Sequence, residues 1–389
     1  MTFRIRTLNA ISPSGTSRLP KDAYEVGHDV TDPHALLVRS ASLHGQEIPG
    51  SVLAVARAGA GTNNIPVAEF SKRGIPVFNT PGANANAVKE LVVAGIFLAA
   101  RNIVDAAAFA HRLDGDHDSM DKAVEAGKKA FVGFELPGRT LGVIGLGAIG
   151  VEVANVAISL GMRVLGYDPA ITVDHAWQLS SKVERVTTLE QVLKRSDIVT
   201  LHVPLVEGTR GLIGADAFKA MRKSAVLINF ARGPIVDEAA LIEALESGQL
   251  RGYVCDFPTP TLNKRPKVVT LPHLGASTAE AEENCAVMAA DELRSYLEDG
   301  TILNSVNFPN AELPRAEGTH RLAIANANVP NMVGQISTVL ANAGLNIADL
   351  LNKSRGDLAY SLIDVEGEIP SEVVAQIAAI EGVLATRAL

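Results

Sequence analysis

The sequence is poor in cysteine, which limits how the chain can be stabilised. Among its 389 residues only Cys255 and Cys285 are cysteines, and neither belongs to a CxxC pair or a cluster of cysteine and histidine. A structural disulfide and a zinc site are therefore not expected, and we predict no metal centre. Two reduced, buried thiols are typical of a protein that works in the cytoplasm.

The sequence also has no excess of positive charge and no long apolar run. The net charge is −8, which argues against a nucleic-acid surface, because phosphate binding requires a basic patch. The most apolar stretch, residues 91–100, is too short to span a bilayer. The first ten residues lack the apolar core of a signal peptide. We therefore expect a soluble cytoplasmic protein whose partners include neither nucleic acid nor membrane.

What the sequence does contain is an alternation of short apolar runs and helical patterns. In the first hundred residues four runs predict strands: 5–8, 35–38, 52–56 and 76–78. Residues 66–73 predict a helix, residues 87–110 a long helix, and residues 111–138 an irregular segment. Strands that alternate with helices favour a parallel sheet covered by helices.

A second and stronger alternation begins near residue 140. Six apolar runs predict strands: 140–144, 163–167, 198–201, 225–228, 252–254 and 268–270. Three segments predict helices: 148–160, 188–194 and 278–297. The predicted fold class is therefore α/β, with two doubly wound parallel sheets of Rossmann type.

The last seventy residues restart with a different order of elements. Residues 305–318 contain Pro309, Pro314 and Gly318 among polar residues, and we interpret them as a linker. Strand, helix, two strands, helix and strand follow, which is the split βαββαβ arrangement. The patterns predict three domains: a discontinuous substrate-binding domain (1–95 and 275–304), a dinucleotide-binding domain inserted into it (96–274), and a small C-terminal domain (319–389).

Residues 145–150 read GLGAIG, a GxGxxG motif between a predicted strand and a predicted helix. Gly145 permits a tight turn, Gly147 lets the backbone approach a pyrophosphate, and Gly150 allows close packing of the helix on the strand. Asp168 ends the next strand, where a carboxylate accepts hydrogen bonds from ribose hydroxyls and repels a 2′-phosphate. The pattern predicts NAD rather than NADP; the alternative is that the glycines serve only a tight turn.

Three further polar patches follow predicted strands, at residues 229–233, 255–260 and 271–278. Open α/β sheets bind their ligands at this edge. Removing hydride from a hydroxy acid requires a base for the hydroxyl proton and a cation for the carboxylate. His273 can be the base and Arg232 the cation. From the residues alone, a hydrogen-bonded surface histidine and a solvated arginine are equally open interpretations.

An ordered set of short motifs then points to a family. The motifs are RAGAG (57–61), NTPG (79–82), GLGAIG (145–150), LHVP (201–204), ARGPIV (231–236), DFPT (256–259) and PHLGAST (272–278). They cover nearly the whole chain and resemble the D-isomer-specific 2-hydroxyacid dehydrogenases, most of all those that act on 3-phosphoglycerate. The resemblance implies an NAD-dependent enzyme that oxidises D-3-phosphoglycerate to 3-phosphohydroxypyruvate, the first step of L-serine biosynthesis.

The resemblance assigns roles to individual positions. Arg232 matches the family's catalytic arginine and His273 its acid/base histidine. The positions implied to line the cofactor are Thr80, Gly145, Gly147, Ala148, Ile149, Gly150, Asp168, Val203, Phe230, Ala231, Asp256, Gly275 and Ala276. The loop of Ala58, Gly59, Ala60 and Gly61 matches one whose backbone holds the substrate carboxylate. Arg57 matches a position near the substrate phosphate, and Arg39 is expected to assist.

The sequence departs from the family at the partner of the histidine. Members usually carry a glutamate just after the DFPT stretch, whereas here Thr259 is followed by Pro260. Asp256 can take over that role as a third catalytic residue, a glutamate within 280–283 can reach His273, or there is no partner. Our hypothesis is that His273 works without the usual glutamate, which a pH–rate profile tests.

Residues 319–389 resemble an ACT domain, a module that binds small molecules in enzymes of amino-acid biosynthesis. Asn328 and Asn346 match asparagines that bind L-serine in related enzymes, but Asn326 and Asn331 replace the expected histidine and glycine. The domain is interpreted either as an allosteric L-serine site or as a dimerisation module without a ligand. The resemblance further implies a homodimer through the long predicted helix, or a homotetramer through the C-terminal domain.

Two other functions stay open at this stage. One is a related reductase of glyoxylate, hydroxypyruvate or another 2-keto acid, and the other is a non-enzymatic corepressor that senses NAD. Arg57 and the ACT-like domain favour a phosphorylated substrate. Arg232, His273 and the acidic net charge argue against the corepressor.

Overall fold

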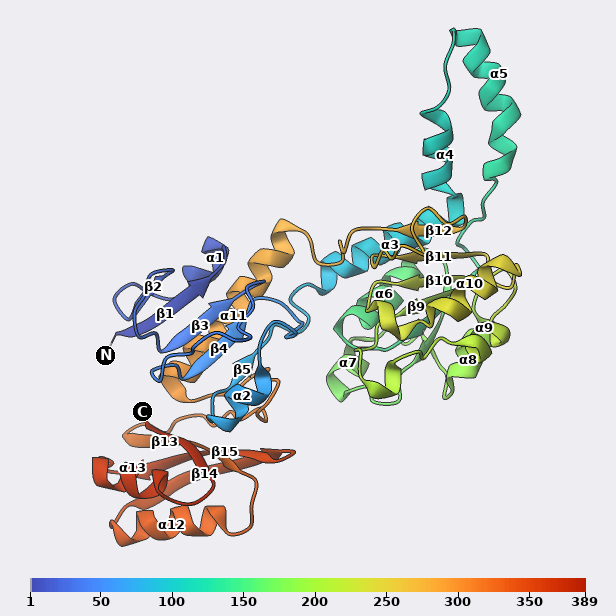
Figure 1. Ribbon diagram of the computed structural model, residues 1–389. Helices are drawn as coiled ribbons and strands as arrows, with labels where there is room; N and C mark the ends of the chain where they lie inside the picture. The colour runs from blue at the N-terminus through green and yellow to red at the C-terminus, as the bar shows by residue number, and fades with distance from the viewer. Residues whose placement is uncertain (1) are drawn as a thin grey trace. The chain divides into compact units, whose positions relative to one another are not determined.

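The computed structural model describes residues 2–389 and divides into two compact units (Figure 1). Unit 1 is formed by the chain up to Asn84 together with Ala279–Leu389, and unit 2 by Ala85–Thr278. The described residues form a five-stranded and a seven-stranded parallel sheet and a four-stranded antiparallel sheet. This is the predicted α/β fold class with a βαββαβ module.

The parallel sheet of unit 1 has the strand order β2-β1-β3-β4-β5. Its strands are β1 (Phe3–Leu8), β2 (Tyr24–Gly27), β3 (Ala35–Val38), β4 (Ala54–Arg57) and β5 (Val77–Phe78). Its helices are α1 (Pro13–Thr16), α2 (Val67–Lys72) and α11 (Ala279–Asp299). All four residues of β3 are buried, as expected for a parallel strand with both faces covered. α11 packs against β3, β4 and β5, so a segment far along the chain completes this sheet.

The parallel sheet of unit 2 has the order β12-β11-β10-β9-β6-β7-β8. Its strands are β6 (Thr140–Ile144), β7 (Arg163–Tyr167), β8 (Glu184–Arg185), β9 (Ile198–Leu201), β10 (Val226–Asn229), β11 (Gly252–Cys255) and β12 (Val268–Thr270). The covering helices are α3 (Ala85–Arg101), α6 (Ala148–Ser159), α7 (Val173–Gln178), α8 (Leu189–Arg195), α9 (Ala215–Ala220) and α10 (Glu238–Glu246). Short 3₁₀ turns lie at Lys128–Phe131, Glu207–Thr209 and Gly233–Ile235.

The single helix expected over 87–110 is broken, which corrects the prediction. α3 ends at Arg101 and α4 (Ile103–Ala110) starts after Asn102, whose φ of +49° is left-handed. The two helices are bent by 65°. Asparagine is one of the few residues that adopt this conformation readily. The helix can therefore break here without the glycine or proline that would have marked the break in the sequence. No single helix among residues 2–389 is long and apolar enough to cross a membrane, and α3 and α4 pass that test only as a bent pair.

The segment 111–138 was expected to be irregular, but it contains α5 (His117–Gly127). The carboxylate of Asp116 caps this helix by accepting a hydrogen bond from the amide of Ser119. Neither α4 nor α5 has a buried residue, so no apolar stripe towards a core marked the helix in the sequence. Both helices project from the body of unit 2 and lie side by side (Figure 1).

The antiparallel sheet of unit 1 has the order β14-β15-β13-β16. Its strands are β13 (Thr319–Ala327), β14 (Asn346–Arg355), β15 (Leu358–Glu366) and β16 (Val383–Ala388), and its helices are α12 (Met332–Asn342) and α13 (Ser371–Ala378). Leu322 and Ile324 face the helices, whereas Ala323 and Ala325 belong to the core that contains α11. The hydroxyl of Tyr360 donates to the carbonyl of Gly300 at 2.7 Å, just beyond α11. The module is therefore packed directly on the rest of unit 1.

The segment 305–318 is only partly a linker, which corrects a second boundary. Ser305, Phe308 and Ala311 are buried. The side-chain amide of Asn307 donates to the carbonyl of Ile75, and its oxygen accepts from the amide of Val77. These bonds tie the start of the segment to the edge strand β5.

Candidate functional site

The predicted site residues of unit 2 follow strands that end at one edge of its sheet. The last residues of six strands pair in one continuous row: Tyr167, Ile144, Leu201, Asn229, Cys255 and Thr270. The residues that come next on each strand are therefore neighbours along that edge. Open α/β sheets bind their ligands there.

The glycine turn that follows β6 has the shape that a dinucleotide requires. Gly145 has a φ of +91°, and a Cβ there would lie 2.7 Å from the backbone carbonyl of His202. A Cβ on Gly150 would overlap the carbonyl oxygen of Gly145. At Gly147, in contrast, a Cβ would meet no atom within 4 Å. The turn is thus tight on its inner side and open beside the first turn of α6, where a pyrophosphate fits.

Asp168 is fixed beside this turn. One oxygen of its carboxylate accepts a hydrogen bond from the amide of Leu146 and the other from the amide of Ala170, both at 2.8 Å. The side chain remains partly exposed, and a carboxylate oxygen can accept more than one hydrogen bond. A ribose hydroxyl can therefore be held here, while a 2′-phosphate is repelled. Ala148 and Ile149, also predicted to line the cofactor, lie in the first turn of α6.

Arg232 follows β10 in a turn shaped by a buried asparagine. The amide nitrogen of Asn229 donates to the carbonyl of Arg232 at 2.9 Å, and its oxygen accepts from the amide of Ala231 at 3.1 Å. The Arg232 side chain is exposed, and its guanidinium donates to the carbonyl of Ala231. Sequence reasoning did not assign a role to Asn229; its signal is a polar residue at the end of an apolar strand. Phe230 is buried under α3, against Gly95.

His273 lies at the end of the row, beside Asp256. Its amide donates to the carbonyl of Asp256 at 3.0 Å, and its ring lies 5.3 Å from the ring of Phe257. The φ of His273 is +52°, a left-handed conformation that is uncommon outside glycine and asparagine. The backbone turn thus holds the exposed imidazole of His273 in a conformation that a non-glycine residue adopts only at some energetic cost.

Asp256 is a buried carboxylate whose backbone carbonyl is bonded to this histidine. Its side chain is 1% exposed, and Oδ2 accepts a hydrogen bond from the amide of Gly275 at 3.0 Å. Burial raises the pKa of Asp256, while the Gly275 amide and the positive charges of His273 and Arg232 lower it. The two charges act on Asp256 because both side chains lie near it. The structure therefore brings Arg232, Asp256 and His273 together.

His202 is a further residue at this edge that sequence reasoning did not single out. It follows β9, its backbone lies against Gly145, and its Nε2 is 3.0 Å from the hydroxyl oxygen of Thr200. Burial lowers its pKa to about 3, so its imidazole is neutral at neutral pH. A neutral ring beside the glycine turn adds no charge to the cofactor position. The sequence could have indicated His202 through the LHVP motif, which also contains the predicted cofactor residue Val203.

The predicted substrate residues lie in unit 1, at the edge of its parallel sheet where β3 and β4 have their carboxyl ends. Arg57 ends β4, and its guanidinium lies so close to Gly59 that a Cβ there would overlap it. The amide of Thr80 donates to the carbonyl of Gly59 at 3.3 Å. Arg39 follows β3 and forms an ion pair with Glu282 in the first turn of α11. The loop of Ala58, Gly59, Ala60 and Gly61 is therefore placed between an arginine and a buried threonine.

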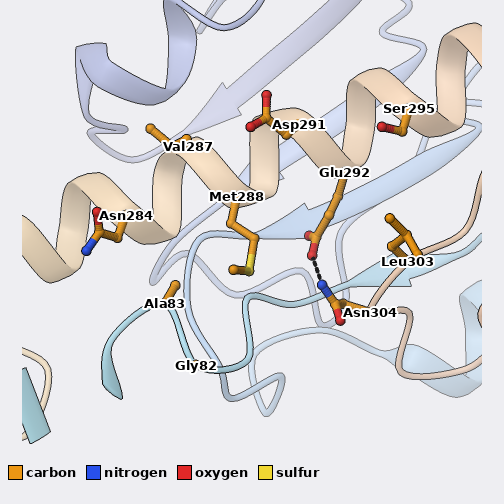
Figure 2. A pocket seen from close by; sticks show the side chains of 10 residues that line it. All are labelled: Gly82, Ala83, Asn284, Val287, Met288, Asp291, Glu292, Ser295, Leu303 and Asn304. Atoms are coloured by element: carbon orange, nitrogen blue, oxygen red, sulfur yellow. Dashed lines mark hydrogen bonds between the residues drawn. The ribbon is translucent and has the colours of Figure 1, made fainter. Parts of the chain in front are cut away.

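Unit 1 also contains a cavity of about 520 Å³ along α11 (Figure 2). Its lining residues are Gly82, Ala83, Asn284, Val287, Met288, Asp291, Glu292, Ser295, Leu303 and Asn304. The amide of Asn304 donates to the carboxyl group of Glu292 at 2.8 Å. None of the predicted substrate or cofactor positions belongs to this lining.

Comparison with known proteins supports the same interpretation of the edge. Residues 100–275 match the family described as D-isomer specific 2-hydroxyacid dehydrogenase, NAD binding domain. A D-3-phosphoglycerate dehydrogenase of Haemophilus influenzae is 34% identical over 95% of this chain and 89% of its own length. The corresponding protein of Escherichia coli is 33% identical over 95% and 90%.

A solved structure of similar fold comes from Entamoeba histolytica. This NAD⁺-bound 3-phosphoglycerate dehydrogenase has a TM-score of 0.62 and 25% identity, over 79% of this chain and 99% of its own. The glycine turn, Asp168 and the strand-end row define an NAD-dependent dehydrogenase. The chain belongs to the family of D-isomer specific 2-hydroxyacid dehydrogenases.

Proposed function

We propose that this enzyme oxidises D-3-phosphoglycerate to 3-phosphohydroxypyruvate with NAD, the first step of L-serine biosynthesis. The observation that carries the proposal is the single edge that holds the glycine turn, Arg232, Asp256 and His273. It is supported by relatives of 31–37% identity that are named D-3-phosphoglycerate dehydrogenases. Neither a 2-keto-acid reductase nor a corepressor is favoured by any feature of this edge.

In the proposed mechanism each side chain acts on one part of the substrate. Arg232 holds the carboxylate with paired hydrogen bonds, and His273 takes the proton of the C2 hydroxyl. The charge of Asp256 stabilises the imidazolium that this transfer creates, in place of the usual glutamate. Bound NAD supplies the acceptor for the hydride that leaves C2.

We assign binding of the rest of the substrate to the domain formed by 1–95 and 275–304, and cofactor binding to 96–274. The backbone of the loop 58–61 offers amides to the carboxylate. Arg57 and Arg39 offer charge-assisted hydrogen bonds to the phosphate, for which guanidinium groups are well suited.

The test is a steady-state assay of NADH formation with 3-phosphoglycerate, on the wild type and on R232A. R232A should lower kcat/KM about 100-fold and affect both kcat and KM, because a charge-assisted contact to the carboxylate is lost. R163A is the matched control, since Arg163 is exposed and begins β7 at the opposite edge of the same sheet. No turnover of 3-phosphoglycerate beside reduction of glyoxylate or hydroxypyruvate would favour the reductase, and no turnover of either would favour the corepressor.

We also propose that the enzyme is a homodimer through α4 and α5. The two helices have no buried residues, yet they expose apolar side chains: Ile103, Val104, Met120 and Val124. Such exposed apolar side chains are typical of an interface. Sedimentation of the wild type and of V104E measures the oligomeric state, and a monomeric wild type contradicts the proposed dimer.

Both cysteines are buried and free, in keeping with the cytoplasmic location that we propose.

For the ACT-like module 319–389 we propose L-serine as an effector, bound through Asn328 and Asn346. Each side-chain amide already donates within the module, Asn328 to the carbonyl of Gly356 and Asn346 to Glu366. L-serine must therefore exchange these partners or bind to the amide oxygens. Calorimetry with L-serine on the wild type and on N346A tests this. Absence of heat with the wild type would leave a module that serves only for assembly, including a tetramer.

A further inference from the structure

Three charged side chains meet at the substrate edge of unit 1. β3 and β4 are adjacent parallel strands, and Val38 pairs with Arg57 in their register. Arg39 and Arg57 therefore emerge at the same edge. The backbone beyond β3 is fixed, because the side chain of Asn64 donates to the carbonyls of Arg39 and Ala41. The cationic end of the predicted substrate pocket is thus built on rigid strand ends.

The acidic residue Glu282 forms an ion pair with Arg39. The guanidinium of Arg39 donates to Oε1 of Glu282, in the first turn of α11. The two side chains are 39% and 41% exposed, so the pair is accessible to a ligand and can exchange partners. An ion pair that is this open contributes little to stability, which leaves its effect on ligands as its main consequence.

Arg39, Arg57 and Glu282 all lie close enough to the buried thiol of Cys285 to act on its pKa. Burial raises the pKa of Cys285, the charges of Arg57 and Arg39 lower it, and the charge of Glu282 raises it. Two positive groups and one negative group therefore lie around this thiol. The negative charge of Glu282 therefore offsets part of the attraction that the two arginines offer to an anion.

We propose that Glu282 is a specificity-determining residue that competes with the substrate's phosphate for Arg39; the proposal rests on the proposed function. A phosphate ester carries close to two negative charges at neutral pH, so it is attracted by the arginines and repelled by Glu282. An unphosphorylated hydroxy acid presents no charge at that end and is not repelled. Glu282 thus makes the difference in affinity between the phosphorylated and the unphosphorylated acid smaller. It sets specificity through an unfavourable contact with the phosphate.

The experiment compares the wild type with E282Q, which keeps the shape of the side chain and removes its charge. KM for 3-phosphoglycerate should fall about three- to tenfold in E282Q, with kcat unchanged, because the repulsion acts on binding. Inorganic phosphate should become a stronger competitive inhibitor by a similar factor, whereas KM for D-glycerate should stay the same. D299N is the control that removes one negative charge elsewhere on the helix, since Asp299 is exposed at the far end of α11.

A double-mutant cycle separates competition from a positioning role. If Glu282 acts by occupying Arg39, the effect of E282Q should vanish in an R39Q background. The proposal is overturned if E282Q raises KM for 3-phosphoglycerate, or if KM and phosphate inhibition do not change. If the wild type does not oxidise 3-phosphoglycerate, the proposed function fails, and calorimetry with inorganic phosphate on both proteins still decides the role of Glu282.

Discussion

The backbone carbonyl of Asp256 accepts a hydrogen bond from the amide of His273, so a buried acid fixes the turn that carries an exposed imidazole. Oδ2 of the same acid accepts the amide of Gly275, and within residues 2–389 no hydrogen-bond donor contacts Oδ1. A buried carboxylate oxygen without a donor is unfavourable unless nearby positive charge offsets it. Here that charge comes from His273 and Arg232.

D256N should lower kcat about tenfold or more while the protein stays folded. Asparagine can still accept the amide of Gly275, but it no longer offers a negative charge to the protonated imidazole. Burial raises the pKa of Asp256, so wild-type kcat should fall as the pH drops through that raised value. D256N should lose the part of the acidic limb that Asp256 contributes, which pH–rate profiles of both proteins measure. A profile and a kcat that match the wild type would remove Asp256 from the mechanism.

H273N should lower kcat about 10²- to 10⁴-fold with a much smaller change in KM, because proton transfer is lost but the carboxylate contacts remain. Asparagine is the informative substitution because it tolerates the φ of +52° at this position. H273G, which also tolerates it, is the companion variant. Steady-state kinetics and the Tm of all three proteins are compared, and near-normal turnover by H273N would disprove the assignment.

The strand-end row could be predicted from the sequence because parallel strands end at one edge by construction. The apolar runs marked the strands, and the residue after each run was therefore placed without knowledge of long-range packing. Arg232 and His273 were placed at this edge in this way. For the partner of His273 the sequence named Asp256 only as one of several alternatives, because the main-chain turn that brings the two residues together leaves no periodic signal.

Features that depend on single residues or on distant contacts were missed. The break at Asn102 requires only one left-handed residue, and α5 faces no core that would impose an apolar stripe. The pair of Arg39 and Glu282 joins positions 243 apart in the sequence, and its partners are ordinary surface residue types. The packing of Tyr360 on Gly300 is likewise a contact between modules that looked independent.

E292Q should make the protein more stable in base and leave it unchanged in acid. The Glu292 side chain is 5% exposed, and in Figure 2 it points from α11 towards Asn304. Burial is the largest cause that raises its pKa, the hydrogen bond from Asn304 lowers it and the charge of Asp291 raises it, and together they move the pKa from 4.5 to about 8. The folded state therefore retains a proton that the unfolded chain releases above pH 4.5.

The contribution of this proton is fully present below pH 4.5 and decreases as the pH rises towards about 8. Glutamine mimics the protonated acid and has no such dependence. At pH 8.5 E292Q should exceed the wild type by about 2–4 kcal/mol, and at pH 4.5 the two should agree within about 0.5 kcal/mol. Urea unfolding at both pH values measures the difference, with E283Q as an exposed control. Equal stabilities at pH 8.5 would show that Glu292 is ionised in the folded protein.

The two glycines of the cofactor turn should respond to alanine in opposite ways. A Cβ on Gly150 would overlap the carbonyl oxygen of Gly145, and backbone cannot move aside as a flexible side chain can. G150A should therefore lower stability by about 1–3 kcal/mol even without NAD. A Cβ on Gly147 meets no protein atom within 4 Å, so G147A should keep the wild-type Tm.

The loss in G147A should show only when the cofactor is added. Its new methyl group stands where the pyrophosphate must approach the backbone, so the Kd for NAD should rise about tenfold or more. Calorimetry with NAD and thermal unfolding with and without NAD measure the two effects separately. Wild-type affinity in G147A would mean that the pyrophosphate does not lie against Gly147, and a strongly lowered Tm without NAD would mean that the space beside it is not open.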